Sequence, residues 1–207
     1  MATLTRRFWG LAALVAAACL SGCAGTPEQT LDACALFEDR PGWYKDAKKA
    51  RKRWGAPIPV QLAIIQQESG FDADARPKRG KFLLVFPGKR PSSAYGYAQA
   101  VDSTWDWYRQ KAGRPGADRD NFGDASDFVS WYVNQTRQQL GVSPSDARRN
   151  YLAYHEGHGD YRRGTHRKKS WLLRRADAVQ RRANAYDAQL IRCEKRLNRG
   201  IPLIPFV

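Results

Sequence analysis

The sequence contains few residues of the kinds that bind metals. It has four cysteines and three histidines in 207 residues, and no Cys-x-x-Cys pair occurs. The histidines, His155, His158 and His166, stand in one stretch of the chain, so their spacing offers no metal site. We therefore expect a protein that needs no metal and no organic cofactor.

Acidic residues are scarce relative to basic ones. Against 20 Asp and Glu stand 35 Lys and Arg, which gives a net charge of +15 and a pI near 10.0. Such an excess of positive charge attracts polyanions, and nucleic acid would be the first partner to consider for a cytosolic chain. The N-terminal leader argues against nucleic acid. Outside the cytoplasm the available polyanions are cell-wall glycan with its acidic peptides, and anionic lipid head groups.

The apolar run near the N-terminus, from Phe8 to Leu20, is too short to cross a membrane as a helix. It follows two arginines and ends in small residues, which is typical of a secretory signal peptide. The closing residues, Leu-Ser-Gly-Cys at 20–23, resemble the lipobox of bacterial lipoproteins, whose cysteine is lipidated and becomes the mature N-terminus. We expect residues 1–22 to be a lipoprotein signal peptide and Cys23 to carry the lipid. An ordinary signal peptide cut elsewhere is the alternative.

Ala24, rather than aspartate, follows this cysteine. By resemblance to lipoprotein sorting in Gram-negative cells, Ala24 favours the outer membrane, with the globular part facing the periplasm. Residues 23–31 are expected to form a lipidated tether. The expected partners are then outer-membrane lipid, through the N-terminal anchor, and cell-wall glycan strands, with the domain acting as a monomer.

Two cysteines remain after Cys19 leaves with the signal peptide and Cys23 takes the lipid. These are Cys34 and Cys193, near the two ends of the secreted domain. An oxidising compartment favours one disulfide that ties the terminal helices together. Two buried free thiols are the alternative.

The segment 32–200 is predicted to be one mainly α-helical domain, followed by a C-terminal tail at 201–207. Capping residues and apolar spacing predict helices at 32–38, 41–54, 59–69, 104–112, 143–154 and 169–198. A further helix that ends at Gly141 is capped by either Asp124 or Ser126. The apolar run from Phe82 to Phe86, between turn signals, predicts a strand or small β-hairpin inserted in the helical domain.

Glu68 is the leading candidate for a catalytic residue. Its helix is expected to open at Pro59 and to close at Gly70, which places Glu68 on the same face as Ile64 and Ile65. A carboxyl on an apolar face is desolvated, so its pKa should rise toward the value that suits a general acid near neutral pH. The alternative is a carboxylate at a frayed helix end that points to water.

Two further short motifs follow Glu68-Ser69 along the chain. They are Gly-Tyr-Ala-Gln at 96–99 and Ala-Tyr-His at 153–155. In this order the three motifs resemble those of the soluble lytic transglycosylases (SLT domain), a family that degrades peptidoglycan and has a goose-type lysozyme-like fold. The resemblance covers roughly residues 54–161, and the lipobox strengthens it.

The resemblance implies a mainly α, lysozyme-like domain and a reaction that needs only one carboxyl group. Glu68 would protonate the glycosidic oxygen between MurNAc and GlcNAc. As a carboxylate it would then take the proton from the C6 hydroxyl of MurNAc, which gives a 1,6-anhydro sugar. The resemblance further implies that Gln99 hydrogen-bonds the substrate and that the Tyr154 hydroxyl orients Glu68. Ser69 and Tyr97 complete the expected substrate-binding set.

The chain also departs from the family pattern. Tyr-Ala at 97–98 replaces Leu-Met, and His155-Glu156 replaces Asn-Ala. Glu156 could then be a second carboxylate, as ordinary glycoside hydrolysis requires, or an exposed, solvated or salt-bridged residue at a helix end. Two alternatives stay open: a hydrolytic muramidase that uses Glu156 or Asp102, and a non-catalytic peptidoglycan-binding lipoprotein. Ser92 and Ser93 are further candidates for hydrogen bonds in the cleft.

Overall fold

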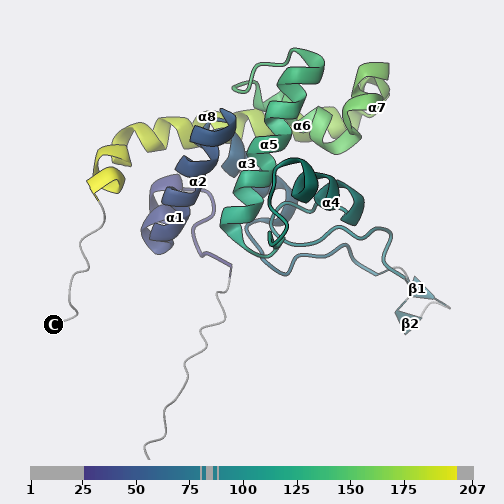
Figure 1. Cartoon of the computed structure of the whole chain (residues 1–207), viewed down its shortest axis with the longest axis horizontal. Coiled ribbons are helices and arrows are strands. Elements are labelled where there is room, and N and C mark those ends of the chain that lie inside the picture. Colours follow the sequence, from purple (N-terminus) through teal and green to yellow (C-terminus); the bar gives the residue numbers. More distant parts are fainter. Residues whose placement is uncertain (1–25, 80, 83–85, 88, 200–207) are drawn as a thin grey trace, which may run out of the picture.

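The described part of the chain is mainly α-helical (Figure 1). The computed structural model describes residues 26–79, 81–82, 86–87 and 89–199. The expected signal peptide, Cys23 and the tail at 201–207 lie outside the described residues. The described helices are α1 (Ala33–Asp39), α2 (Pro41–Trp54), α3 (Ile58–Ser69), α4 (Asp102–Lys111), α5 (Phe122–Leu140), α6 (Ala147–Glu156), α7 (His158–Arg163), the 3-10 helix η1 (Thr165–Lys168) and α8 (Ser170–Arg199).

Prolines and glycines set the helix ends near the site. Pro41 is the first residue of α2, and Gly55, with a φ of 85°, ends it in the left-handed region. The next helix, α3, begins at Ile58, one residue before the predicted start, and ends at Gly70, which has a φ of 64°. These breakers fix the length of α3 and so the position of Glu68 in its last turn.

The first two turns of α3 are buried on every side. All residues from Ile58 to Ile65 are buried, because α2, α5, α6 and α8 pack around this helix. The polar member of the run, Gln61, donates to the carbonyls of Ala47 at 3.2 Å and Ala56 at 2.8 Å, and accepts from Ser126 at 2.6 Å. These three hydrogen bonds offset the cost of desolvating the amide in the core. The buried part of α3 therefore extends to the turn before the one that carries Glu68.

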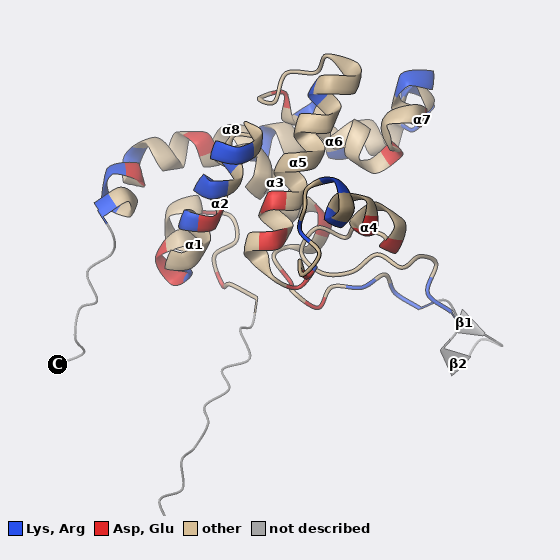
Figure 2. Cartoon of the chain, in the orientation of Figure 1, with Lys and Arg blue, Asp and Glu red and all other residues tan. Residues whose placement is uncertain are grey.

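The longest helix, α8, runs across the domain (Figure 1). It packs against α3 and α6 and, further along, against α1. Basic residues lie on α2, on α7 and at the C-terminal end of α8 (Figure 2). Much of the positive charge therefore lies on helices of the folded domain.

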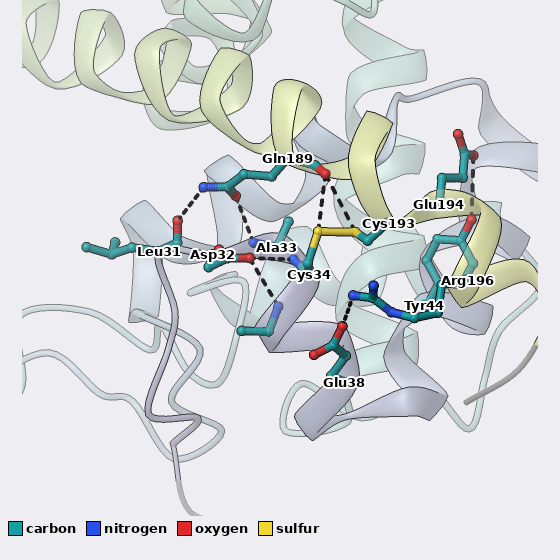
Figure 3. Close-up of a disulfide and its surroundings, with 11 residues drawn as sticks. Leu31, Asp32, Ala33, Cys34, Glu38, Tyr44, Gln189, Cys193, Glu194 and Arg196 are labelled. Atoms are coloured by element: carbon teal, nitrogen blue, oxygen red, sulfur yellow. Dashed lines mark hydrogen bonds and ion pairs between the residues drawn. A yellow bond between two sulfur atoms is a disulfide. The ribbon is translucent and has the colours of Figure 1, made fainter. Parts of the chain in front are cut away.

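A disulfide joins the first and last helices (Figure 3). Cys34 of α1 and Cys193 of α8 are bonded, across 159 residues of sequence. Next to this bond, Gln189 accepts from the backbone N–H of Ala33 at 2.8 Å and donates to the carbonyl of Leu31 at 3.2 Å (Figure 3). The two cysteines that the sequence leaves as a pair thus tie the terminal helices together.

The predicted small β-hairpin insertion is not borne out as an element of the fold. The only described ladder consists of β1 (Lys81–Phe82) and β2 (Phe86–Pro87), two residues each, and the intervening positions 83–85 lie outside the described residues. Both segments lie away from the helices (Figure 1). A two-stranded ladder without further strands is marginal in water, and in the described part of the chain no third strand pairs with this one. Apart from this two-residue ladder, the described domain is helical.

Within the described residues, no helix is long and apolar enough to span a membrane.

Candidate active site

A cavity of about 500 Å³ opens at the C-terminal end of α3. The segment that precedes α4 forms one side, and α5 and α6 form the other. Its lining consists of Glu68, Ser92, Ala94, Gln99, Ala100, Val101, Thr104, Phe128, Tyr132, Tyr154, His155, Glu156 and Gly157. Glu68, Gln99 and Tyr154, which are far apart in the sequence, therefore meet in one cavity.

Glu68 lies where the buried part of α3 gives way to the cavity. Ile64 and Ile65 are fully buried, whereas Glu68 keeps part of its surface exposed to the cavity. The surrounding protein desolvates the carboxyl and raises its pKa from 4.5 to about 7. A hydrogen bond with Tyr151 and the positive charge of Arg175 act in the opposite direction and limit the rise. The carboxyl can therefore hold a proton or release it near neutral pH, as acid–base chemistry requires.

The Tyr154 hydroxyl does not make the contact that the sequence suggested for it. It donates to the carbonyl of Ala98 at 2.5 Å, in the loop that carries Gln99. The hydrogen bond to Glu68 comes instead from Tyr151, one helical turn earlier on α6. Burial, and secondarily the charge of Glu68, raises the pKa of Tyr154 well above 10, so its hydroxyl stays protonated. Tyr151 and Arg175 are thus site residues that the motifs missed.

The Gly96–Gln99 motif forms a tight turn at the cavity wall. Gly96 has a φ of 73°, and a Cβ there would lie 2.1 Å from the carbonyl oxygen of Arg119, so only glycine fits. The side-chain nitrogen of Gln99 donates to the carbonyls of Ala75 and Gly96, both at 2.8 Å. With these two donors engaged, Gln99 offers an oxygen acceptor to a ligand in the cavity.

Residues 11–193 of the chain match the family model of the transglycosylase SLT domain. The chain belongs to the SLT-domain transglycosylase family. The matched segment includes all the cavity residues and both disulfide cysteines. No curated protein and no solved structure matches the chain. The helical architecture is consistent with the lysozyme-like fold expected of an SLT domain.

Two residues of the expected substrate-binding set do not line the cavity of this SLT domain. Ser69 accepts from the N–H of Phe71 at 3.1 Å and donates to the carbonyl of Ile65, so it shapes the end of α3. Tyr97 is 5% exposed and packs its ring against Trp43 and Phe122 in the core. Each motif sets these residues close to one that lines the cavity, Glu68 or Gln99, but the side chains of Ser69 and Tyr97 point to other surroundings.

The two candidate serines of the cleft separate in the structure. Ser92 lines the cavity, whereas the Ser93 hydroxyl accepts from the N–H of Asp102 at 3.0 Å. Ser93 thereby caps the first N–H of α4. Asp102 itself is largely exposed and pairs with Arg119 at 2.8 Å, and it is not among the residues of the cavity wall.

Glu156, the second carboxyl of the SLT-domain cavity, is held by several hydrogen bonds. Of the two states expected for a helix-end residue, solvated or salt-bridged, the structure shows the salt bridge, to Lys169, and only 2% of the side chain is exposed. Lys169 donates to both of its oxygens, at 2.7 and 2.9 Å, and Thr165 and His155 also bond to it. Burial alone would raise the pKa of this carboxyl, but these hydrogen bonds and the charge of Lys169 outweigh it and hold the pKa below the ordinary value. These contacts favour the carboxylate form of Glu156 and tie the end of α6 to Thr165 in η1 and to Lys169, which precedes α8.

Among the described residues, no group of His, Cys, Asp and Glu is arranged to hold a metal ion.

Proposed function

We propose that this SLT-domain protein is a peptidoglycan lytic transglycosylase for cell-wall remodelling. It would cleave the MurNAc–GlcNAc bond without water and leave 1,6-anhydro-MurNAc ends. The observation that carries the proposal is the state of Glu68: one carboxyl, partly buried in the cavity wall, with a pKa of about 7. Such a group can be acid and base in turn, which is what a reaction with a single catalytic carboxyl demands.

In the first step, protonated Glu68 gives its proton to the glycosidic oxygen, and the bond from that oxygen to C1 of MurNAc breaks. The carboxylate left behind takes the proton of the C6 hydroxyl on the same sugar. The oxygen of that hydroxyl bonds to C1, which closes the 1,6-anhydro ring and returns the proton to Glu68. Because nucleophile and reaction centre belong to one residue of the substrate, proximity lowers much of the barrier.

Other residues of the cavity position the substrate and the acid. The oxygen of Gln99 would accept a hydrogen bond from the sugar, since its nitrogen is held by two backbone carbonyls. Tyr154 supports this arrangement through its bond to Ala98, next to Gln99. Tyr151 would hold the carboxylate form of Glu68 in place by its hydrogen bond.

The proposal is tested by digestion of purified sacculi and mass analysis of the products. Anhydro-muropeptides are expected from the wild-type protein and should be absent with Glu68→Gln. The loss should be at least about 100-fold, the smallest factor usual for a general acid. Products with reducing ends, or no products at all, would contradict the proposal.

A second candidate function is hydrolytic muramidase, because Glu156 lies in the same cavity and is ionised. Hydrolysis needs a second carboxylate as base or nucleophile. The bonds that Lys169 and Thr165 donate to Glu156 favour a structural role for Glu156, since a carboxylate that is already paired is a poor base. Reducing-end products from wild type that disappear with Glu156→Gln would establish the muramidase.

We further propose that the protein is an outer-membrane lipoprotein facing the periplasm, anchored through Cys23 and the tether at 23–31. The leader and the residues 20–23 support this proposal. The variant Cys23→Ala should leave the membrane fraction while its turnover on soluble glycan stays the same. If the variant stays with the outer membrane at low salt and a high-salt wash releases it, the basic surface holds the protein and the lipid does not.

A further inference from the structure

An exposed tryptophan stands beside the cavity. Trp171, in the first turn of α8, is 42% exposed, and it is one of three large apolar side chains that stand out in this way among the described residues. Its ring contacts the ring of His155 edge to face, with the centroids 5.2 Å apart. His155 itself lines the cavity. The indole therefore extends the cavity wall outward onto α8.

An arginine completes this outer surface. Arg175 lies one turn after Trp171, and its guanidinium carbon is 5.1 Å from the centroid of the indole ring. On its inner side Arg175 hydrogen-bonds with Tyr151, the partner of Glu68. Arg175 thus connects an exposed aromatic side chain to the centre of the cavity.

We infer that Trp171 and Arg175 form a subsite that binds a glycan ring together with a carboxylate of the acidic peptide attached to it. The inference rests on the proposed function for the identity of the glycan, and it adds that the peptide is recognised. Two observations favour this occupant. The surface continues the cavity wall through His155, and it places an apolar aromatic ring next to a guanidinium group.

Each part of the surface suits one part of such a ligand. The exposed indole can cover the apolar face of a sugar ring, as aromatic rings do at the centre of binding surfaces. The planar guanidinium presents paired N–H donors that match a carboxylate. A neutral glycan would gain only from the first of these contacts, so the arginine predicts a preference for strands that keep their charged peptides.

The test measures binding in the Glu68→Gln background, which removes cleavage. Calorimetric titration would use a GlcNAc–MurNAc tetrasaccharide with its peptides, and the same compound with every peptide carboxyl converted to an amide. Arg175→Gln should weaken binding of the charged compound about fivefold, the upper range for an exposed ion pair, and change the amidated one less than twofold. Trp171→Ala should weaken both about tenfold.

The neighbouring residue supplies a matched control. Arg174 is also exposed but lies about 100° around the helix from Arg175, so Arg174→Gln should leave both affinities unchanged. Arg175→Lys should retain part of the preference for the charged compound. Equal effects of Arg175→Gln on the two compounds, or no effect of Trp171→Ala on either, would overturn the subsite. Absence of anhydro products from wild-type digests would instead overturn the proposed reaction, and the affinity ratios would still decide the subsite.

Discussion

Replacement of Glu68 by glutamine should stabilise the folded protein at alkaline pH while it abolishes cleavage. In the fold the pKa of Glu68 rises from 4.5 to about 7, because burial disfavours the charged form. Between these two pH values the folded state holds a proton that the unfolded state has lost. The free energy of unfolding therefore falls as the pH rises through this window. Glutamine carries no charge at any pH, so the variant escapes this loss.

The size of the effect follows from the width of the window. Each pH unit within it lowers the free energy of unfolding by about 1.4 kcal/mol, which gives about 3 kcal/mol in full. Because Glu68 keeps part of its surface exposed to the cavity, solvent reduces this value. We expect Glu68→Gln to be more stable than wild type by about 1–3 kcal/mol at pH 8 and equally stable at pH 4. In a domain of this size that is a rise in Tm of about 2–10 °C at pH 8.

The assay is thermal unfolding between pH 4 and pH 9, with Glu156→Gln as the matched control. Glu156 has a lowered pKa in the fold, so its contribution is present above the unfolded pKa and is lost as the pH falls. Glu156→Gln should therefore be less stable than wild type at pH 8, the opposite sign. A Glu68→Gln variant that is no more stable than wild type at pH 8 would refute the desolvated, protonated carboxyl.

Three other outcomes are expected. Tyr151→Phe removes a hydrogen bond that lowers the pKa of Glu68, so this pKa should rise. In a pH–rate profile, the alkaline pH at which cleavage falls to half its maximum should then rise by up to about one unit. Gly96→Ala should lower stability by about 2–4 kcal/mol in urea unfolding and impair cleavage, because its Cβ meets a backbone carbonyl. Gly141→Ala, also at positive φ but in open space, should cost only about 1 kcal/mol; equal losses would contradict the steric argument. Cys34→Ser should lower stability by about 4–5 kcal/mol, and an unchanged Tm would show that the bridge is absent in solution.

Local signals in the sequence predicted seven of the eight described α-helices, but they missed α7 (His158–Arg163) and placed the start of α6 four residues too early. The bounds of α2 agree with the prediction, because Pro41 and Gly55 act on their own turns without help from the rest of the fold. The apolar run from Phe82 to Phe86 misled for the opposite reason. A strand needs neighbouring strands or a covering helix, and the run itself carries no information about them.

The candidate site was predictable only where its residues belong to a motif. Glu68, Gln99 and Tyr154 were found in this way and meet in the cavity. Tyr151 lies on the same face of α6 as Tyr154, three residues earlier, so helical spacing could have indicated it. Arg175 could not be predicted from the sequence. It acts on Glu68 from a helix more than 100 residues further along the chain, and no local sequence pattern indicates that the two residues are close.

The disulfide and Arg175 lie far apart on α8, so the disulfide and the groups around Glu68 stabilise the protein independently. Arg175 and Cys193 are 18 residues apart on one helix, about 27 Å along its axis. Over that distance the bridge cannot alter the desolvation of Glu68, which depends on groups in direct contact with it. It acts instead on the unfolded chain, by closing a loop of 159 residues. Reduction should therefore lower Tm and leave the pH dependence of cleavage unchanged, whereas Tyr151→Phe should move that pH dependence. If reduction shifts the pH profile, α8 carries strain from the disulfide to the carboxyl of Glu68, and the site cannot be treated as a local assembly.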